Sequence, residues 1–241
     1  MRIDGKSDAA EQWSQRFAEM SQTAQRLDQL ELKRLHYRNS LGTDLTIGMP
    51  EAYSWQTCLS QAEGRQRFVM NLPTEEIYTV PHREQVSGIV YGSLPLVYQG
   101  CLIQDFWLRF EHGKVVQAGA AKGEDTLQAL ISYDENSAYL GEVALVPCDS
   151  AISQTGMLFY NPLYDENASC HLALGMGIVE AVPGGGAMSP QELAAHGINH
   201  SGIHLDFMIG TPDLSITGTT RQGEEIPIFE DGKFALGLIK N

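Results

Sequence analysis

The chain has 241 residues, a formal net charge of −14, a hydrophobic fraction of 43% and a charged fraction of 19%. This composition allows a sizeable core and excludes an intrinsically disordered chain. The acidic balance argues against nucleic acid and anionic membrane as partners, because both attract lysine and arginine. No apolar run approaches the roughly 20 residues that span a bilayer, and the polar residues 1–12 lack the apolar core of a signal peptide. We therefore expect a cytoplasmic protein.

Cysteine use is consistent with that compartment. The cysteines are scattered and form no CxxC pair, so neither a zinc ribbon nor a disulfide framework is indicated. We expect free thiols in a reducing cytoplasm. They stand at Cys58, Cys101, Cys148 and Cys170.

The first predicted element is an amphipathic helix near the amino terminus. Apolar residues recur there at steps of three or four, which places them on one stripe. Asp8 followed by Glu11 resembles a capping box at its start. Because such a helix is marginal by itself, we expect it to pack on the rest of the domain. The stripe consists of Trp13, Phe17, Met20, Ala24, Leu27 and Leu30.

Short strands between turns are expected after about residue 35, with Gly113 marking a hairpin. Helices are predicted over about Gly123–Tyr133 and from Pro190, where Ser189 and Glu192 supply the cap. The predicted strands are Asp44–Gly48, Arg67–Asn71, Gly88–Tyr91, Phe106–Phe110, Val115–Gln117, Ile203–Ile209, Asp213–Thr217 and Ile226–Phe229.

These strands and helices do not alternate regularly, which favours an α+β fold. We predict mixed strands with a few helices, and the amino-terminal amphipathic helix packed on a β-rich core. No internal repeat divides the sequence.

Four places carry side chains that could bind a cation, and the clearest is the predicted strand Ile203–Ile209. Side chains alternate along a strand, so His204 and Asp206 would share one face, opposite to Leu205 and Phe207. An ionisable pair in an otherwise apolar strand is costly to bury unless something neutralises it, and a bound cation would do so. A structural His–Asp hydrogen bond is the open alternative.

The other three places are ambiguous by themselves. Glu142 heads an apolar run and would be a ligand, a rim residue or a cap. His171 lies in the segment 165–175, whose polar start predicts a helix, and it would be a ligand or a core histidine. Glu76 follows a strand end, where a solvated turn is the alternative, and its neighbour Glu75 would be an acid–base group or a surface residue.

Taken together, these places resemble a known family. The segments NLPTEE, GEVALVP, FYNPLYDENASCHLALG and HLDFMIG are similar to signature segments of the metallo-aminopeptidases typified by aminopeptidase T, aminopeptidase S and PepS. The stretches GTDLTIGMPE, SLPLVYQGCLIQDF and IPIFEDGKFAL support the resemblance, which runs in order from near Ile3 to the end. It implies peptide substrates, a homodimer, and a single metal-binding peptidase domain over residues 1–241 without the family's amino-terminal domain.

The resemblance also implies a set of five ligands that bind two divalent metal ions, with Glu142 bridging them. Paired cations of this kind polarise the scissile carbonyl and lower the pKa of a bound water. Mixed carboxylate and imidazole ligands suit zinc, cobalt or manganese. The matching positions are Glu76, Glu142, His171, His204 and Asp206.

One position departs from the family pattern. Family members usually carry a tyrosine seven residues after the histidine of DENASCHLALG, and this chain has Ile178 there. Isoleucine can neither ligate a metal nor donate a hydrogen bond to an oxyanion, and loss of one oxyanion donor costs about 10²–10³ in rate in other hydrolases.

Three functions therefore remain. The favoured one is a dinuclear metal-dependent aminopeptidase, or its metal-binding carboxyl-terminal domain. The main alternative is a non-catalytic metal-binding or dimerisation module, degenerate at Ile178. A cysteine hydrolase that uses Cys170 with His171 is remoter, because neighbouring side chains diverge on a helix or a strand.

Overall fold

The computed structural model describes residue 5 and residues 8–61 and 67–239. Its larger sheet has strands β1 (Leu32–Arg38), β2 (Asp44–Gly48), β6 (Val86–Tyr91), β9 (Trp107–Glu111), β10 (Lys114–Gly119), β14 (Ser215–Thr220), β15 (Glu225–Glu230) and β16 (Lys233–Phe234). They are ordered β10-β9-β6-β2-β1-β14-β15-β16, and every neighbouring pair is antiparallel.

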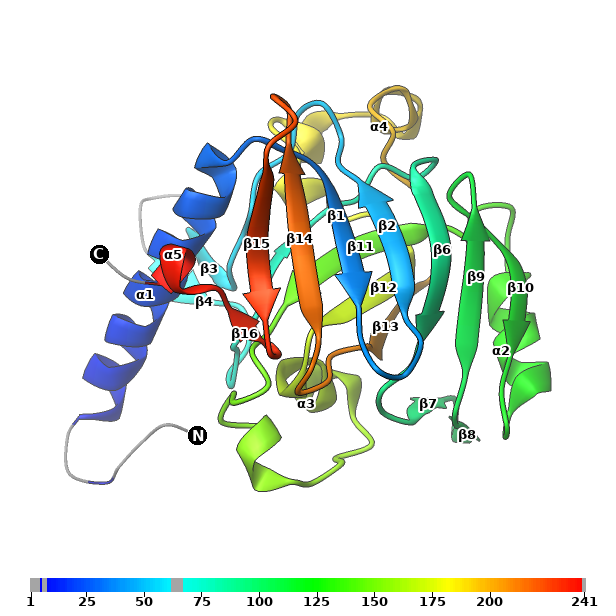
Figure 1. Cartoon of the computed structure of the whole chain (residues 1–241), viewed down its shortest axis with the longest axis horizontal. Coiled ribbons are helices and arrows are strands. Elements are labelled where there is room, and N and C mark those ends of the chain that lie inside the picture. Colours follow the sequence, from blue (N-terminus) through cyan, green and yellow to red (C-terminus); the bar gives the residue numbers. More distant parts are fainter. Residues whose placement is uncertain (1–4, 6–7, 62–66, 240–241) are drawn as a thin grey trace.

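A second, four-stranded sheet lies behind the first in Figure 1. It consists of β5 (Ile77–Thr79), β11 (Leu140–Leu145), β12 (His171–Gly175) and β13 (His204–Met208), in the antiparallel order β13-β12-β11-β5. Two small hairpins pair β3 (Leu59–Gln61) with β4 (Arg67–Val69), and β7 (Leu96–Tyr98) with β8 (Cys101–Ile103).

Helices are few and mostly short. The α-helices are α1 (Ala9–Gln29), α2 (Glu124–Ile131), α3 (Pro162–Asp165), α4 (Pro190–Ala195) and α5 (Leu236–Ile239). The 3₁₀ turns are η1 (Ser153–Thr155), η2 (Glu166–Ala168), η3 (Val179–Ala181) and η4 (Gly185–Ala187). The predicted α+β class is thus confirmed.

The amino-terminal helix forms for the reasons that its sequence suggests. The Asp8 side chain caps α1 by accepting a hydrogen bond from the Ala10 N–H at 2.8 Å. Phe17, Met20 and Leu27 of its stripe are buried against the β-rich core, as expected. The predicted cap of α4 is present too, because Ser189 and Glu192 form a reciprocal capping box.

The main core lies between the two sheets. Leu172 of β12 and Leu35 and Ile47 of the larger sheet are completely buried in one apolar cluster. Phe207 of β13 meets Phe106 edge-on, with ring centroids 5.9 Å apart. One face of the four-stranded sheet therefore packs in the apolar core. The opposite face is outside this core and carries the other side chains of these strands.

One expected element is wrong. The segment 165–175 was expected to be helical, but only its first residues turn, in α3 and η2, before the chain becomes extended at Ser169. His171 then begins β12, which pairs with strands on both sides. Ladder hydrogen bonds to two neighbours outweigh the local helical preference of this segment. The strand predicted over Arg67–Asn71 is likewise confined to β4.

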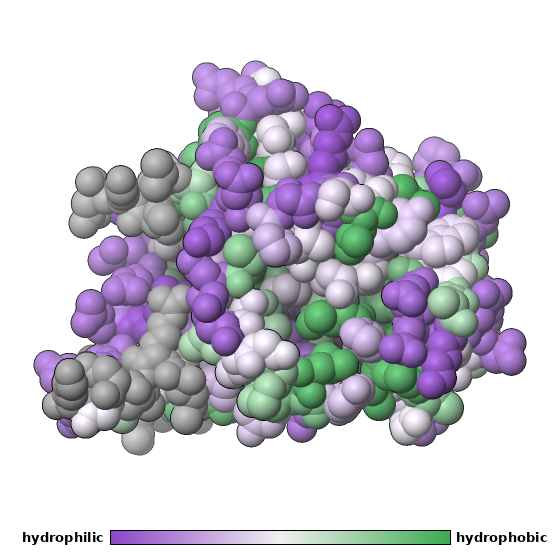
Figure 2. All heavy atoms as spheres, turned by 60° about the horizontal axis from the view of Figure 1, so that its bottom comes forward, coloured by the Kyte–Doolittle hydropathy of each residue, from purple (hydrophilic) through white to green (hydrophobic). Residues whose placement is uncertain are grey.

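Two surface features complete the description. Among the described residues, no helix is both long enough and apolar enough to cross a membrane. Figure 2 brings the bottom of Figure 1 forward and shows apolar surface gathered there between hydrophilic margins.

Candidate metal centre

The five predicted ligands meet on the face of the four-stranded sheet that points away from the core. Ala173 of β12 pairs with Glu142 on one side and with Asp206 on the other. His171 precedes Ala173 by two positions and therefore shares its face. His204 precedes Asp206 by two positions in the same way, and Glu76 enters from the residue just before β5.

Small residues make room between these polar side chains. Ala144 and Ala173 occupy two positions on the same face that carry no predicted ligand, and both are buried. Gly175 has a φ of 101°, and a Cβ there would clash with the carbonyl oxygen of Ile203. The absence of a side chain at Gly175 lets the end of β12 approach the backbone of Ile203 closely. Gly175 is paired there with His204.

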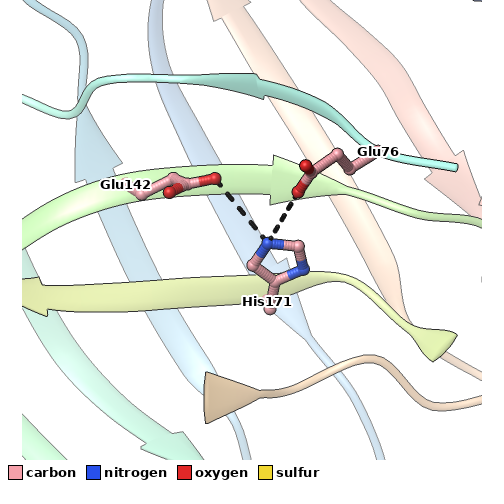
Figure 3. Close-up of side chains that lie close together, drawn as sticks. All are labelled: Glu76, Glu142 and His171. Carbon is pink, nitrogen blue, oxygen red and sulfur yellow. Dashed lines mark ion pairs between the residues drawn. The ribbon is translucent and has the colours of Figure 1, made fainter. Parts of the chain in front are cut away.

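One group of three predicted ligands is buried. The Nε2 atom of His171 lies 3.2 Å from Oε2 of Glu76 and 3.7 Å from Oε1 of Glu142 (Figure 3). These three residues are 1%, 6% and 5% exposed, respectively. One ligand atom from each lies within 4.8 Å of the others, a spacing at which a single cation can contact all three.

A second group lies at the rim and shares Glu142 with the first. The Nε2 atom of His204 is 3.1 Å from Oε2 of Glu142 and 3.2 Å from Oδ1 of Asp206. The side chains of His204 and Asp206 are 29% and 14% exposed. The two oxygens of Glu142 thus face different groups, Oε1 the buried one and Oε2 the rim one.

Backbone carbonyls orient both imidazoles. The Nδ1 atom of His171 lies 3.2 Å from the Ser169 carbonyl oxygen, and that of His204 lies 2.9 Å from the Met176 carbonyl oxygen. A carbonyl can only accept, so it fixes the proton on Nδ1 of the neutral ring and leaves the Nε2 lone pair facing the carboxylates. This is the orientation that a metal-ligating imidazole needs.

Mutual attraction shifts the pKa values of these groups strongly. Burial alone would raise the pKa of Glu142, but attraction from the nearby imidazoles of His171 and His204 outweighs it and lowers that pKa to about 2. Burial would lower the pKa of His204, yet Asp206 and Glu142 raise it to about 11. The pKa of His171 is likewise raised well above 6.5 by Glu142 and Glu76, against the effect of burial.

These residues fit a divalent cation. Nε2 of His171 is buried and has no well-aligned hydrogen bond within the described part of the chain, although Glu76 is close. No lysine or arginine among the described residues forms an ion pair with Glu76, Glu142 or Asp206. Three buried or half-buried carboxylates and two imidazoles are a donor set that zinc, cobalt and manganese accept.

Three residues near the centre were missed by the sequence interpretation. Cys58 donates a hydrogen bond from its thiol to Oε1 of Glu76 at 3.1 Å. Burial raises the pKa of the Cys58 thiol, and the charge of Glu76 raises it further. Glu166 follows α3, and burial together with the charge of Glu76 raises its pKa to about 8. Tyr78 of β5 lies on the same face as Glu76, which precedes the strand, and packs beside Cys58. Only Glu166, inside the DENASCHLALG segment, carried any sequence signal.

Several other candidates lie away from this face. Glu75 is buried and accepts a hydrogen bond from Arg16 of α1 at 2.6 Å, so it ties the helix to this loop. Cys170 is buried in the main core, where burial raises its pKa to about 12. That environment disfavours a thiolate nucleophile.

The remaining histidines also lie away from the centre. His36 lies in the larger sheet, 2.7 Å from Asp44. His112, His196 and His200 are solvent-exposed, and His82 is half-buried.

Comparison with known proteins gives consistent matches over most of the chain. The thermophilic metalloprotease (M29) family matches residues 1–234. Aminopeptidase AmpS of Bacillus subtilis (strain 168) is 45% identical over 223 residues, which are 92% of this chain and 54% of that protein. Aminopeptidase 2 of Geobacillus stearothermophilus is 38% identical over 98% of this chain and 57% of that protein.

A solved structure is similar as well. Wild-type AmpT from Thermus thermophilus superposes with a TM-score of 0.86 at 36% identity, covering 92% of this chain and 55% of that chain. The chain spans about half the length of the curated relatives it matches.

Proposed function

Because this chain belongs to the thermophilic metalloprotease (M29) family, we propose that it is a dinuclear metallo-aminopeptidase, or the metal-binding domain of one. It removes amino-terminal residues from peptides. The resemblance noted in the sequence is confirmed by the family match, and a divalent metal cofactor follows from the family. The number of cations, the substrate and the catalytic competence of this chain belong to the proposal.

The observation that carries the proposal is the pair of ligand groups that share Glu142. Under this proposal, Glu76 and His171 would hold one cation, His204 and Asp206 would hold the other, and Glu142 would be shared by both groups. Bound cations would polarise the scissile carbonyl and lower the pKa of a water molecule. The protein's own part is to orient both imidazoles through backbone carbonyls and to leave the rim group accessible to a peptide.

Metal stoichiometry and turnover test this function together. The purified chain should hold two cations after equilibration with zinc, cobalt or manganese, counted by elemental analysis. With at least one of these metals it should cleave aminoacyl anilides, and a chelator should abolish the cleavage. No bound metal after supplementation would refute the site, whereas two bound metals without any turnover would refute the enzyme and leave the site.

A non-catalytic metal-binding module is the second candidate, and the position of Ile178 favours it. Ile178 packs against the cluster of Cys58, Tyr78 and Ala144 on the site side of the sheet. A tyrosine there would bring a hydroxyl toward the centre. Under the catalytic proposal, Ile178→Tyr leaves a substantial rate nearly unchanged. Under the module proposal, the native chain is nearly inactive and the variant gains up to about 10²–10³ in rate, the scale of one oxyanion donor.

The remaining parts of the proposal concern assembly and location. We propose that the chain forms a homodimer in the cytoplasm. All four cysteines are free, which suits a reducing compartment. Phe68, Met70 and Leu72, just before the metal centre in sequence, are 44%, 54% and 49% exposed and could be covered by a second copy. Sedimentation of a single monomeric species at micromolar concentration would refute the dimer.

A further inference from the structure

The thiol of Cys58 stands beside Glu76 because of how the backbone pairs. Gln56 and Tyr78 exchange two backbone hydrogen bonds, of 2.8 and 3.0 Å, as an isolated antiparallel bridge. In an antiparallel pair, a step of two residues forward on one chain faces a step of two residues back on the other. Cys58 is therefore placed opposite Glu76. Its own carbonyl accepts a hydrogen bond from the Met70 N–H at 3.0 Å, which holds the segment from the other side.

The two oxygens of Glu76 have different partners as a result. Oε1 accepts the hydrogen bond from Cys58 Sγ at 3.1 Å, and Oε2 lies 3.2 Å from Nε2 of His171. The dashed line between Glu76 and His171 in Figure 3 marks this contact of Oε2. A carboxylate only accepts hydrogen bonds, so the thiol must be the donor. Cys58 and Glu76 are 3% and 6% exposed, so little water competes for this bond.

We propose that Cys58 is a positioning residue of the metal centre: its thiol engages Oε1 of Glu76 so that Oε2 alone faces the cation shared with His171. This inference rests on the proposed function, in which Glu76 is a ligand. The terminal torsion of a glutamate is broad, so an unrestrained carboxylate would sample orientations that do not bind productively. Partners that orient a ligand in this way typically contribute about 10–100-fold in metal affinity.

The effect should be confined to one of the two cations. Of the five residues of the metal centre, Glu76 is the one to which the Cys58 thiol hydrogen-bonds in the described structure. His204 and Asp206 of the rim group are instead oriented by the Met176 carbonyl and by each other. Loss of the thiol therefore disturbs the buried group and leaves the rim group nearly intact.

The experiment compares three variants of the full chain. Cys58→Ala removes the donor, and Cys58→Ser keeps a donor at nearly the same place. Cys170→Ala is the matched control, because the Cys170 thiol is also buried but, within the described part of the chain, it hydrogen-bonds to the backbone of Val146 and to no metal-centre side chain. Zinc and cobalt affinities are measured by competition with a chromophoric chelator, and the unfolding temperature of each apo protein is recorded beside them.

The expected result is an asymmetric change. Cys58→Ala weakens one of the two sites by about 10–100-fold and leaves the other within a few-fold. Cys58→Ser restores most of the lost affinity, and Cys170→Ala leaves both affinities unchanged even where it lowers the unfolding temperature.

Other outcomes separate the two proposals. A wild-type chain that binds no metal overturns both the site and the positioning role. Two metals bound by the wild type with unchanged affinities in Cys58→Ala overturn the positioning role alone. The positioning role is also overturned if Cys58→Ser binds metal as weakly as Cys58→Ala, or if Cys58→Ala weakens both sites equally. A sulfur-to-cobalt charge-transfer band that disappears in Cys58→Ala would make the thiol a direct ligand, which also overturns a positioning role.

Discussion

The two faces of the four-stranded sheet are built from the same strands and carry opposite chemistry. Leu172 and Leu174 of β12 are at most 1% exposed and join the apolar core, whereas His171, in the same strand, points into a group of carboxylates. Alternation of side chains assigns successive residues to opposite faces. The core face supplies the burial that stabilises the sheet. The site face can therefore carry several charged side chains close together. Stability and metal binding should therefore be separable by substitution.

The largest effect is expected on the site face, at the residue that both ligand groups share. Glu142→Gln keeps the size of the side chain and removes the bridging charge, so at least one cation should be lost. Activity should fall by on the order of 10⁴, the scale seen when one member of a catalytic unit is removed. Elemental analysis and anilide turnover measure both losses. Exposed Glu111→Gln is the control, and a Glu142→Gln protein with wild-type metal content would contradict the assignment.

On the core face, we expect a substitution to lower stability and to leave metal binding unchanged. Leu172 is completely buried between the sheets, so Leu172→Ala should reduce the free energy of unfolding by about 2–5 kcal/mol through lost burial and a residual cavity. The folded fraction should still bind two cations with unchanged affinity. Denaturant unfolding with and without metal gives both quantities. Selective loss of metal binding in a stably folded Leu172→Ala protein would contradict the separation of stability and metal binding between the two faces.

A smaller effect tests the space that the site face keeps open. Ala173 lies between Glu142 and Asp206 in the cross-strand row, and Ala173→Leu would fill the volume between their carboxylates. Overpacking typically costs about 1–3 kcal/mol, and here we expect that cost to appear as weaker metal binding. Calorimetric titration with zinc measures it. Ala129→Leu on the exposed side of α2 adds the same bulk and should change nothing.

A further effect should appear in the pH dependence of the apo protein. Asp206 and Glu142 outweigh burial and raise the pKa of His204 from 6.5 to about 11. The folded protein thus keeps a proton that the unfolded chain releases near pH 6.5, so this contribution to stability is full below that pH and declines as the pH rises toward 11. The unfolding temperature of the apo protein should fall between about pH 6 and about pH 9.

The metal-loaded protein should respond differently, because a cation replaces the proton on the imidazole. Its unfolding temperature should hold steady or rise over the same range. Scanning calorimetry of both forms, with His204→Gln as the variant that reduces the apo slope, makes the measurement. An apo protein whose stability rises through this window would show that the imidazoles are not held as cations by the carboxylates.

Local signals in the sequence were sufficient for some elements and some of the site. The repeating apolar stripe predicted α1, and the Ser189–Glu192 cap predicted the start of α4, because both depend on contacts within a few residues. Alternation placed His204 and Asp206 on one face of β13, where the structure has them. The family signature added Glu76, Glu142 and His171, which no local pattern distinguished from caps and core residues. Their role as metal ligands stays a prediction.

Long-range pairing decided the rest. Amino-acid order alone determined the periodicities, the caps and the alternation of faces, since these follow from the geometry of a single helix or strand. Only the folded sheet decided that His171 belongs to a strand, that Glu142 faces two imidazoles at once, and that Cys58 meets Glu76 across a bridge. Backbone ladders between segments that are distant along the chain set those contacts, and their register is a property of the paired strands together.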